Sequence, residues 1–186
     1  MKRFFDLFMG VVILMLLAIP MLMIAIVVRL SSKGPSLYWS DRVGKNNKIF
    51  KMPKFRSMLI DTPAVATHLL DSPNKYLSPI GGFLRHFSLD ELPQIFSILK
   101  GDMSFVGPRP ALFNQEDLIA LRSENDLDKL IPGLTGWAQV NGRDDLSIQE
   151  KILLEVEYKQ KKSFWFDLRI LLLIFLKVIN RRGVSH

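Results

Sequence analysis

The chain contains no cysteine and only three histidines. Without cysteine, disulfide bonds and thiolate catalysis are excluded, and a reducing cytosolic setting is allowed. Because the histidines are only His68, His86 and His186, no histidine cluster for a metal ion is evident. A metal in this protein would therefore be held by oxygen atoms, which favours magnesium or a similar hard cation.

Acidic residues are fewer than basic ones. The chain has 18 Asp and Glu against 25 Lys and Arg, which gives a net charge of +7. Hydrophobic residues make up 48% of the sequence, and a basic chain with an apolar segment suggests an anionic membrane surface or a phosphorylated substrate. Nucleic acid is the usual alternative partner of a basic chain, but the sequence has no nucleic-acid-binding motif, so none is expected.

The most prominent feature that is present is a long uncharged run at residues 7–28. As a straight helix it would extend about 33 Å, enough to cross the core of a bilayer. A signal peptide is disfavoured, because the run is long for one and no small-residue cleavage site follows it. Pro20 lies inside the run and would break a backbone hydrogen bond and bend the helix. Basic residues flank the run on both sides, so a helix that crosses and one that returns to the same face both stay open.

Residues 31–55 predict a short β-hairpin, with a polar turn at residues 44–47 between two segments that contain aromatic residues. Lys54 and Arg56 are two residues apart, so both cations would share one face of an extended strand. That face is either solvated or in contact with phosphate. The next segment, residues 61–79, has three prolines and little periodicity, and is predicted to be a loop with a short helix.

Charged residues stand beside apolar ones throughout residues 84–110, with Asp90 and Glu91 at the centre. One interpretation is a helix start, in which Ser88 and Glu91 form a capping box, although Pro93 fits poorly at the fifth helical position. The other is a catalytic carboxylate pair, with one nucleophile or metal ligand beside an acid–base helper. Both can hold together, since a helix N-terminus also binds phosphate.

The same stretch carries two arginines with open roles. Arg85 either pairs with Glu91 or faces a phosphate. Arg109 lies between two prolines, and an arginine held that rigidly suits bidentate binding of phosphate. The alternative is a surface turn with a solvated arginine. Between them, residues 95–106 form a short amphipathic run, which is either core packing or a helix at the membrane interface.

The C-terminal half is less informative. Residues 111–131 form a polar helical segment to which no chemistry is assigned. Residues 132–143 are predicted to be a loop with three glycines, where Gln139 and Arg143 offer donors to a phosphate or nucleotide, unless the loop is only a structural turn. Residues 147–162 predict a helix that begins with a capping box.

The last apolar segment, residues 164–180, is interrupted by charges. Its longest uncharged run is too short to span a bilayer. Aromatic residues at its start and basic residues at its end suit the membrane interface.

Several longer motifs occur in order along the chain. They are KRFFDL at residues 2–7, KFRSM at 54–58, SLDELPQ at 88–94, LKGDMSFVGPRP at 99–110 and PGLTGWAQVNGR at 132–143. Together they resemble the signature of the bacterial sugar transferases that are monotopic phosphoglycosyl transferases. The resemblance covers nearly the whole chain, and its length of 186 residues resembles the minimal form with only the catalytic domain.

The resemblance implies a mainly α fold with a small β-hairpin, in the α+β class, in a monotopic membrane protein. Residues 1–32 would form a re-entrant helix–break–helix centred on Pro20. Residues 33–186 would form a catalytic domain on the cytoplasmic face, with amphipathic helices at the membrane interface. The implied location is the inner membrane of a bacterium.

The resemblance also implies a reaction, the transfer of a sugar-1-phosphate from a UDP-sugar to polyprenyl phosphate, with release of UMP. This would be the first membrane step in the synthesis of a bacterial glycoconjugate. By this resemblance Asp90 would be the nucleophile and a ligand of Mg²⁺, and Glu91 would place the metal or manage protons. The implied contacts to phosphate or nucleotide are Arg109, Arg143, Lys54, Arg56, Arg85 and Gln139. Anionic membrane lipids are a further implied partner, and a homodimer is left open.

Two other functions remain as alternatives. One is a membrane-anchored binding or scaffold protein, whose basic surface would hold anionic lipid or a partner enzyme. The other is a metal-dependent hydrolase of lipid diphosphates, which would release phosphate without a nucleotide sugar. Release of UMP from a UDP-sugar in the presence of polyprenyl phosphate separates the transferase from both.

Overall fold

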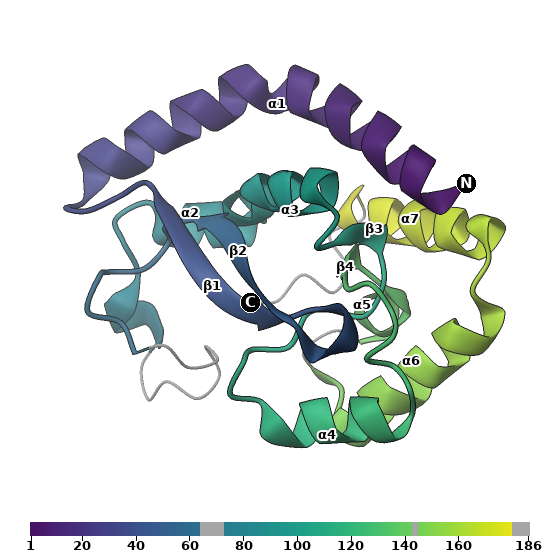
Figure 1. The fold of residues 1–186 in the computed structure, drawn as a ribbon. Coiled ribbons are helices and arrows are strands. Elements are labelled where there is room, and N and C mark those ends of the chain that lie inside the picture. The colour runs from purple at the N-terminus through teal and green to yellow at the C-terminus, as the bar shows by residue number, and fades with distance from the viewer. Residues whose placement is uncertain (64–72, 143–144, 180–186) are drawn as a thin grey trace.

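The computed structural model describes residues 1–63, 73–142 and 145–179. The helices are α1 Lys2–Ser31, α2 Gly81–His86, α3 Ile95–Lys100, α4 Glu116–Glu124, α5 Trp137–Asn141, α6 Ile148–Lys161 and α7 Phe164–Ile179. The strands are β1 Leu37–Val43, β2 Ile49–Phe55, β3 Ser104–Val106 and β4 Gly133–Thr135. This mostly helical fold with a small hairpin confirms the expected α+β class. Figure 1 shows α1 arching over one side of the molecule, with α2, α3 and α7 beneath it and α4 and α6 on the far side.

Helix α1 is one helix of 30 residues that contains Pro20. Proline has no N–H to donate to the carbonyl four residues earlier, which favours a bend at this point. The structure accordingly has a bent, continuous helix (Figure 1) where a helix–break–helix is expected. It is long and apolar enough to cross a membrane. Its re-entrant insertion stays a prediction.

The two ends of α1 are anchored to the domain by arginines. Arg3 donates to the carbonyls of Ile98 and Leu99 at 2.6 and 2.7 Å, where α3 ends and its carbonyls need donors. A Cβ added to Gly10 would lie 2.8 Å from Leu99 Cδ2, so α1 and α3 pack closely at this position. At the other end, Arg56 donates to the carbonyl of Ser32 at 2.8 Å.

Strands β1 and β2 form the predicted antiparallel hairpin. The turn is a short 3-10 helix, Lys45–Asn47, in which Asn46 and Asn47 have φ of 55° and 57°. Asparagine tolerates this left-handed conformation better than most residues, which is why the polar turn forms here. The hairpin therefore confirms what its turn residues predicted.

The segment around Asp90 is not the α-helix that a capping box would start. Leu89–Gln94 is a 3-10 helix, η4, and Ser88 before it has φ of 54° and makes no side-chain cap. The Ser88–Glu91 capping box is therefore absent, and that interpretation is wrong. The reason is that the Glu91 carboxylate binds cations from other segments, as described below.

Residues 95–106 do not form one amphipathic element. Helix α3 stops at Gly101, which has φ of 101°, and strand β3 follows. Strand β3 pairs in parallel with β4, and helix α5 comes next, so residues 132–141 are not the predicted loop. A parallel pair joins segments that are distant in sequence, and three-residue strands leave too little periodicity to be recognised.

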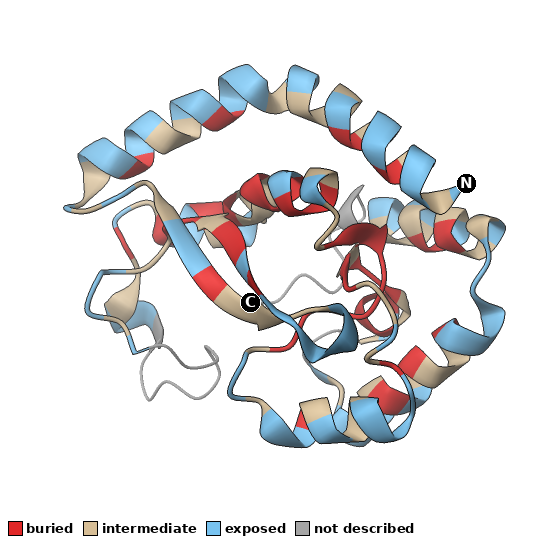
Figure 2. Cartoon of the chain, in the orientation of Figure 1, coloured by how far each residue is buried: buried red, intermediate tan, exposed pale blue. Residues whose placement is uncertain are grey.

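The hydrophobic core lies between the helices beneath α1, which are α2, α3 and α7, and the two small sheets. Figure 2 shows buried residues concentrated in α3, β2, β3 and the inner side of α7, while the outer side of α1 is exposed. The core includes Ile98, Met103, Val106 and Ile170, all at most 2% exposed. Helix α6 begins with the predicted capping box, in which Ser147 and Glu150 bond to each other's backbone. These elements hold η4 against β2 and so position the candidate site.

Candidate active site

Glu91 is the point at which three segments of the chain meet. Lys54 on β2 and Arg109 in the loop after β3 each donate to the same oxygen, Glu91 Oε1, at 2.9 Å. The side chains of Lys54 and Glu91 are only 16% and 14% exposed, so this pairing is largely shielded from water. Asp90 is adjacent on η4 and is also buried.

The two neighbouring carboxylates have opposite environments. Burial alone would raise the pKa of Glu91, but Lys54 and Arg109 outweigh it and hold that pKa well below its usual range. Burial raises the pKa of Asp90, and the charge of Glu91 acts in the same direction, against Lys54, Arg85 and Arg109. Adjacent carboxylates whose pKa values are pushed apart are typical of a site where one reacts and the other holds its neighbours.

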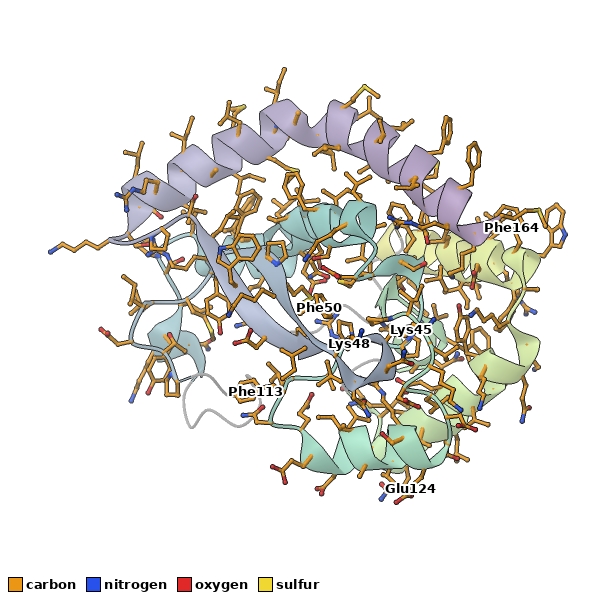
Figure 3. The ribbon with its side chains drawn as sticks, viewed as in Figure 1. Lys45, Lys48, Phe50, Phe113, Glu124 and Phe164 are labelled. Carbon is orange, nitrogen blue, oxygen red and sulfur yellow. The ribbon has the colours of Figure 1, made fainter. Side chains whose placement is uncertain are left out.

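Arg42 joins this cluster, although no role was predicted for it. The hairpin register pairs Arg42 with Phe50 and Lys54 with Tyr38, which puts both cations on one face. Phe50, labelled in Figure 3, is buried and marks that face as the inner one. Burial, and then the charge of Arg109, lower the pKa of Arg42 to about 10, so it stays protonated at neutral pH.

The cluster carries a surplus of positive charge. In the part of the chain that the structure describes, the cations Arg42, Lys54, Arg85 and Arg109 act on the two carboxylates. A partly buried site with more cations than anions favours a ligand that brings negative charge. Arginine forks beside a lysine are well suited to phosphate oxygens.

The loop that carries Arg109 is held at five of its six carbonyls between residues 106 and 111. The donors are Lys2 to Val106, the Gly133 N–H to Pro108, Arg122 to Arg109, Arg42 to Pro110 and the Val43 N–H to Ala111. The two prolines have fixed φ and no N–H, so these acceptors define the path of the loop. Arg109 is therefore presented in one direction, as its flanking prolines predicted.

Not every predicted contact residue joins the cluster. Arg56 follows the end of β2, and its guanidinium donates to the carbonyls of Ser32 and Lys33. The structure gives it this buried contact at the end of α1 in place of the phosphate-binding face that it was expected to share with Lys54. Arg85, by contrast, lies near enough to Asp90 to affect its pKa.

The remaining predicted contacts lie in the third motif. Gln139 on α5 is 8% exposed, and its amide has no hydrogen-bond partner among the described residues. A Cβ added to Gly136 would lie 2.7 Å from Gln139 Oε1 and 2.1 Å from the carbonyl oxygen of Gly107. The Gln139 amide therefore lies close to the backbone of Gly136. A contact of Gln139 with a nucleotide stays a prediction, and Arg143 lies outside the described residues.

The donor set near Asp90 fits a metal that shares its ligands with a substrate. Among the described residues there is no group of three or more acidic or histidine side chains that could enclose a metal. Glu91 Oε1 already accepts from two cations, so Asp90 is the carboxylate of the pair that is better suited to bind a metal. Mg²⁺ commonly binds through one or two carboxylates together with substrate phosphates and water, so a single carboxylate is compatible with it.

The sequence reasoning gave no role to two further residues near the site. Arg122 on α4 and Glu155 on α6 form a buried ion pair, and Arg122 also donates to the carbonyl of Arg109. Residues 111–131 read as a solvated helix, because charges distributed over a short helix do not reveal which of them is buried. An acid at Glu155 within the apolar face of α6 is a signal that could have indicated a buried partner.

The chain belongs to the bacterial sugar transferase family, whose model matches residues 1–181. It is 39% identical to the UDP-glucose:undecaprenyl-phosphate glucose-1-phosphate transferase of Escherichia coli, over 97% of this chain and 41% of that protein. It is 36% identical to the undecaprenyl-phosphate glucose phosphotransferase of Komagataeibacter xylinus, over 98% of this chain and 36% of that protein. It is 38% identical to EpsL of Bacillus subtilis, described as an uncharacterized sugar transferase, over the whole chain and 91% of EpsL. The chain thus spans less than half the length of the first two relatives.

Proposed function

We propose that this protein transfers a sugar-1-phosphate from a UDP-sugar to polyprenyl phosphate, giving a polyprenyl-diphosphate-sugar and UMP. The observation that carries the proposal is the buried Asp90 beside Glu91, inside a cluster of cations. Family membership supports it, as do the activities for which relatives that act on undecaprenyl phosphate are named. Such a transfer would begin the assembly of a glycan at the bacterial membrane.

The chemistry has two displacements at one phosphorus. A carboxylate oxygen of Asp90 attacks the phosphorus nearest the sugar, the bond from that phosphorus to the oxygen of UMP breaks, and UMP leaves. An oxygen of polyprenyl phosphate then attacks the same phosphorus and releases the Asp90 carboxylate. A carboxylate can accept a phosphoryl group in this way when the charge of the phosphate is neutralised first.

The surrounding residues would supply that neutralisation. Two arginines are held by hydrogen bonds at the loop of residues 106–111. The carbonyl of Arg109 accepts from Arg122, and Arg42 donates to the carbonyl of Pro110. Glu91, with its low pKa and two ion pairs, would hold Lys54 and Arg109 in place. Asp90 would provide the protein ligand of Mg²⁺, which when bound neutralises phosphate charge and stabilises the leaving UMP.

The membrane would bring the lipid substrate to Asp90. Helix α1 exposes large apolar residues along its length, and the layer beneath it adds exposed aromatic side chains. These are Phe83 and Phe87 near α2, Phe96 on α3, and Trp165 and Phe175 on α7. We propose that these helices lie at the cytoplasmic surface of the inner membrane, with α1 inserted into one leaflet around Pro20, and that anionic lipids contact the basic surface.

The test of the activity is to mix the purified chain with undecaprenyl phosphate, Mg²⁺ and one UDP-sugar at a time. We expect UMP release with at least one of UDP-glucose, UDP-galactose and their N-acetylhexosamine counterparts, and release that requires the lipid phosphate for turnover. Release of inorganic phosphate from a lipid diphosphate without any UDP-sugar would instead identify a hydrolase. Lipid binding without turnover of any donor would identify a scaffold protein.

The test of the topology uses the natural absence of cysteine. One cysteine is added ahead of Met1 or introduced as Lys33→Cys, and each is labelled from one side of sealed membranes. Both sites should react from the same side in the otherwise natural chain. In Pro20→Ala, which restores the missing donor and favours a straight helix, we expect the two sites to separate in part. Labelling from opposite sides in the natural chain would contradict the re-entrant helix and leave the chemistry untouched.

A further inference from the structure

The ion pair between Arg122 on α4 and Glu155 on α6 is more buried than the pairs around Glu91. Arg122 Nε donates to Glu155 Oε2 at 2.8 Å, and Arg122 Nη2 donates to Glu155 Oε1 at 2.5 Å. The two side chains are 11% and 4% exposed. This two-point contact fixes the plane of the guanidinium as well as its position.

Arg122 also reaches the candidate active site. Its Nη2 donates to the backbone carbonyl of Arg109 at 2.9 Å, and Arg109 Nη2 in turn donates to Glu91. A continuous chain of contacts therefore runs from Glu155 through Arg122 and Arg109 to the carboxylate beside Asp90. The side chain of Arg109 begins at the residue whose carbonyl Arg122 holds.

The neighbouring backbone cannot hold the carbonyl of Arg109 on its own. Proline at 108 and at 110 removes two N–H donors, and the other acceptors of the loop belong to residues before or after Arg109. A rotation of the peptide bond that follows Arg109 would swing its guanidinium away from Glu91 unless the carbonyl is held. Arg122 is the donor that holds it among the described residues.

We propose that Arg122 and Glu155 are positioning residues for Arg109, with Glu155 orienting Arg122 and Arg122 setting the direction of the Arg109 guanidinium toward a substrate phosphate. This rests on the proposed function, since the phosphate is that of the UDP-sugar. A buried ion pair is weak evidence for stability by itself, because removing two charges from water offsets much of their attraction. A shift of the acting group by about 1 Å can cost about a hundredfold in rate, so positioning explains the pair better.

The competing explanation is that the pair only joins α4 to α6. Both explanations predict a lower unfolding temperature for Arg122→Gln, so stability does not separate them. They differ on whether the loss of activity passes through Arg109. A joint between two helices lowers the fraction of folded protein, whereas a positioning residue changes the rate and substrate affinity of the folded fraction.

The experiment compares Arg122→Gln, Glu155→Gln and Glu155→Asp with Asp126→Asn, which removes the acid of an exposed ion pair on the same side of the molecule. Activities are measured with the donor that releases most UMP and are expressed per folded molecule. We expect kcat/KM for the donor to fall about 10- to 100-fold in Arg122→Gln and Glu155→Gln. The Asp126→Asn control should stay within about twofold of the natural chain, and Glu155→Asp should recover part of the activity because it keeps the charge.

A double-mutant cycle with Arg109→Lys decides between the explanations. If Arg122 acts through Arg109, adding Arg122→Gln to the Arg109→Lys variant should lower kcat/KM by a much smaller factor than Arg122→Gln does in the natural chain. Costs that simply add, or full activity per folded molecule in Arg122→Gln, would overturn the positioning role.

A binding measurement separates this proposal from the proposed function. Inorganic pyrophosphate is titrated into the natural chain and into Arg122→Gln by calorimetry, with no UDP-sugar present. We expect binding to weaken several-fold in Arg122→Gln and to be unchanged in Asp126→Asn. If no UDP-sugar is turned over but this pattern holds, the positioning role stands and the transferase assignment fails. If UDP-sugar turnover is found but pyrophosphate binds both chains equally, the positioning role fails alone.

Discussion

Besides Glu155, the described residues include two pairs of acidic side chains that are largely shielded from water, and the two pairs are satisfied in different ways. Asp90 and Glu91 lie among four cations, with Lys54 and Arg109 on one oxygen of Glu91. Asp6 on α1 and Asp167 on α7 lie near the start of α1 and are 4% and 6% exposed. In the part of the chain that the structure describes, four cations act on the first pair, whereas Lys2 and Lys162 act on the second.

The second pair is bonded by neutral donors and by Lys2, and Lys162 lies near enough to Asp167 to interact with it as well. Asp167 accepts from Lys2 Nζ at 2.5 Å and from the Tyr158 hydroxyl at 2.8 Å. Asp6 accepts from the hydroxyl of Ser104 and the N–H of Phe105. Burial, and then the charge of Asp167, raise the pKa of Tyr158, so it stays a hydroxyl donor. The ring of Phe164, labelled in Figure 3, packs against the ring of Phe5 beside this network, with 5.5 Å between the ring centroids.

The comparison separates structural burial from functional burial. A buried carboxylate whose oxygens accept hydrogen bonds from donors within the protein connects the segments that carry those donors, as Asp167 connects α7 to α1. A buried carboxylate beside surplus cations, such as Asp90, keeps a raised pKa and an environment that favours further negative charge. The three predictions below test this difference, from the largest expected effect on turnover to the smallest.

Asp90→Asn should abolish turnover, with a fall of at least about a thousandfold, because the reacting oxygen is replaced. It should also leave no labelled protein when the donor carries a radiolabelled sugar. Since burial raises the pKa of Asp90, its ionised form opposes folding at neutral pH, and the variant should unfold at the same temperature as the natural chain or higher. Retained turnover, or a loss of stability large enough to explain its absence, would remove the nucleophile assignment.

Glu91→Gln should reduce turnover about 10- to 100-fold and still allow the labelled protein to form slowly, because Asp90 is intact. It leaves Lys54 and Arg109 with a neutral partner, so we expect a loss of about 3 kcal/mol in the free energy of unfolding. Thermal unfolding in detergent and single-turnover labelling measure the two effects. Asp41→Asn, in the exposed pair with Lys51, is the matched control and should change neither. Wild-type labelling rates in Glu91→Gln would contradict its role in holding the cations.

Asp167→Asn should lower stability by about 3 kcal/mol, because it leaves Lys2 partly buried without its partner. Turnover per folded molecule should fall only a few-fold, since Lys2 still donates to the carbonyl of Val106 ahead of the Arg109 loop. Thermal unfolding together with activity at a temperature well below the transition measures both. A loss of turnover as large as that of Glu91→Gln, with unchanged stability, would show that this second pair is also part of the active site.

Local signals predicted much of this fold. The Gly44–Lys45–Asn46–Asn47 turn predicted the hairpin, and Ser147 with Glu150 predicted the start of α6, because each depends on residues within a few positions of one another. The carboxylate pair and Arg109 were also recognised, since their motif lies in one stretch.

Signals of the same kind failed where distant residues compete. The Ser88–Glu91 capping box is a correct local pattern, yet Lys54 and Arg109 draw the Glu91 carboxylate away from the backbone. Ion pairs with two cations outweigh one hydrogen bond to an N–H. Arg56 was expected beside Lys54, but the strand ends between them and Arg56 binds the end of α1.

The order of residues alone determined the apolar helix and the hairpin, because these depend on composition and on short spacings along the chain. It also determined the family, through motifs that match over nearly the whole chain. Tertiary structure alone decided that Arg42 and Lys54 both act on Glu91, that β3 pairs with β4, and that Glu155 reaches Arg109 through Arg122. The physical reason is that a charge on a helix or strand has no fixed partner until packing removes it from water. Burial then makes the choice of partner strong enough to shape the site.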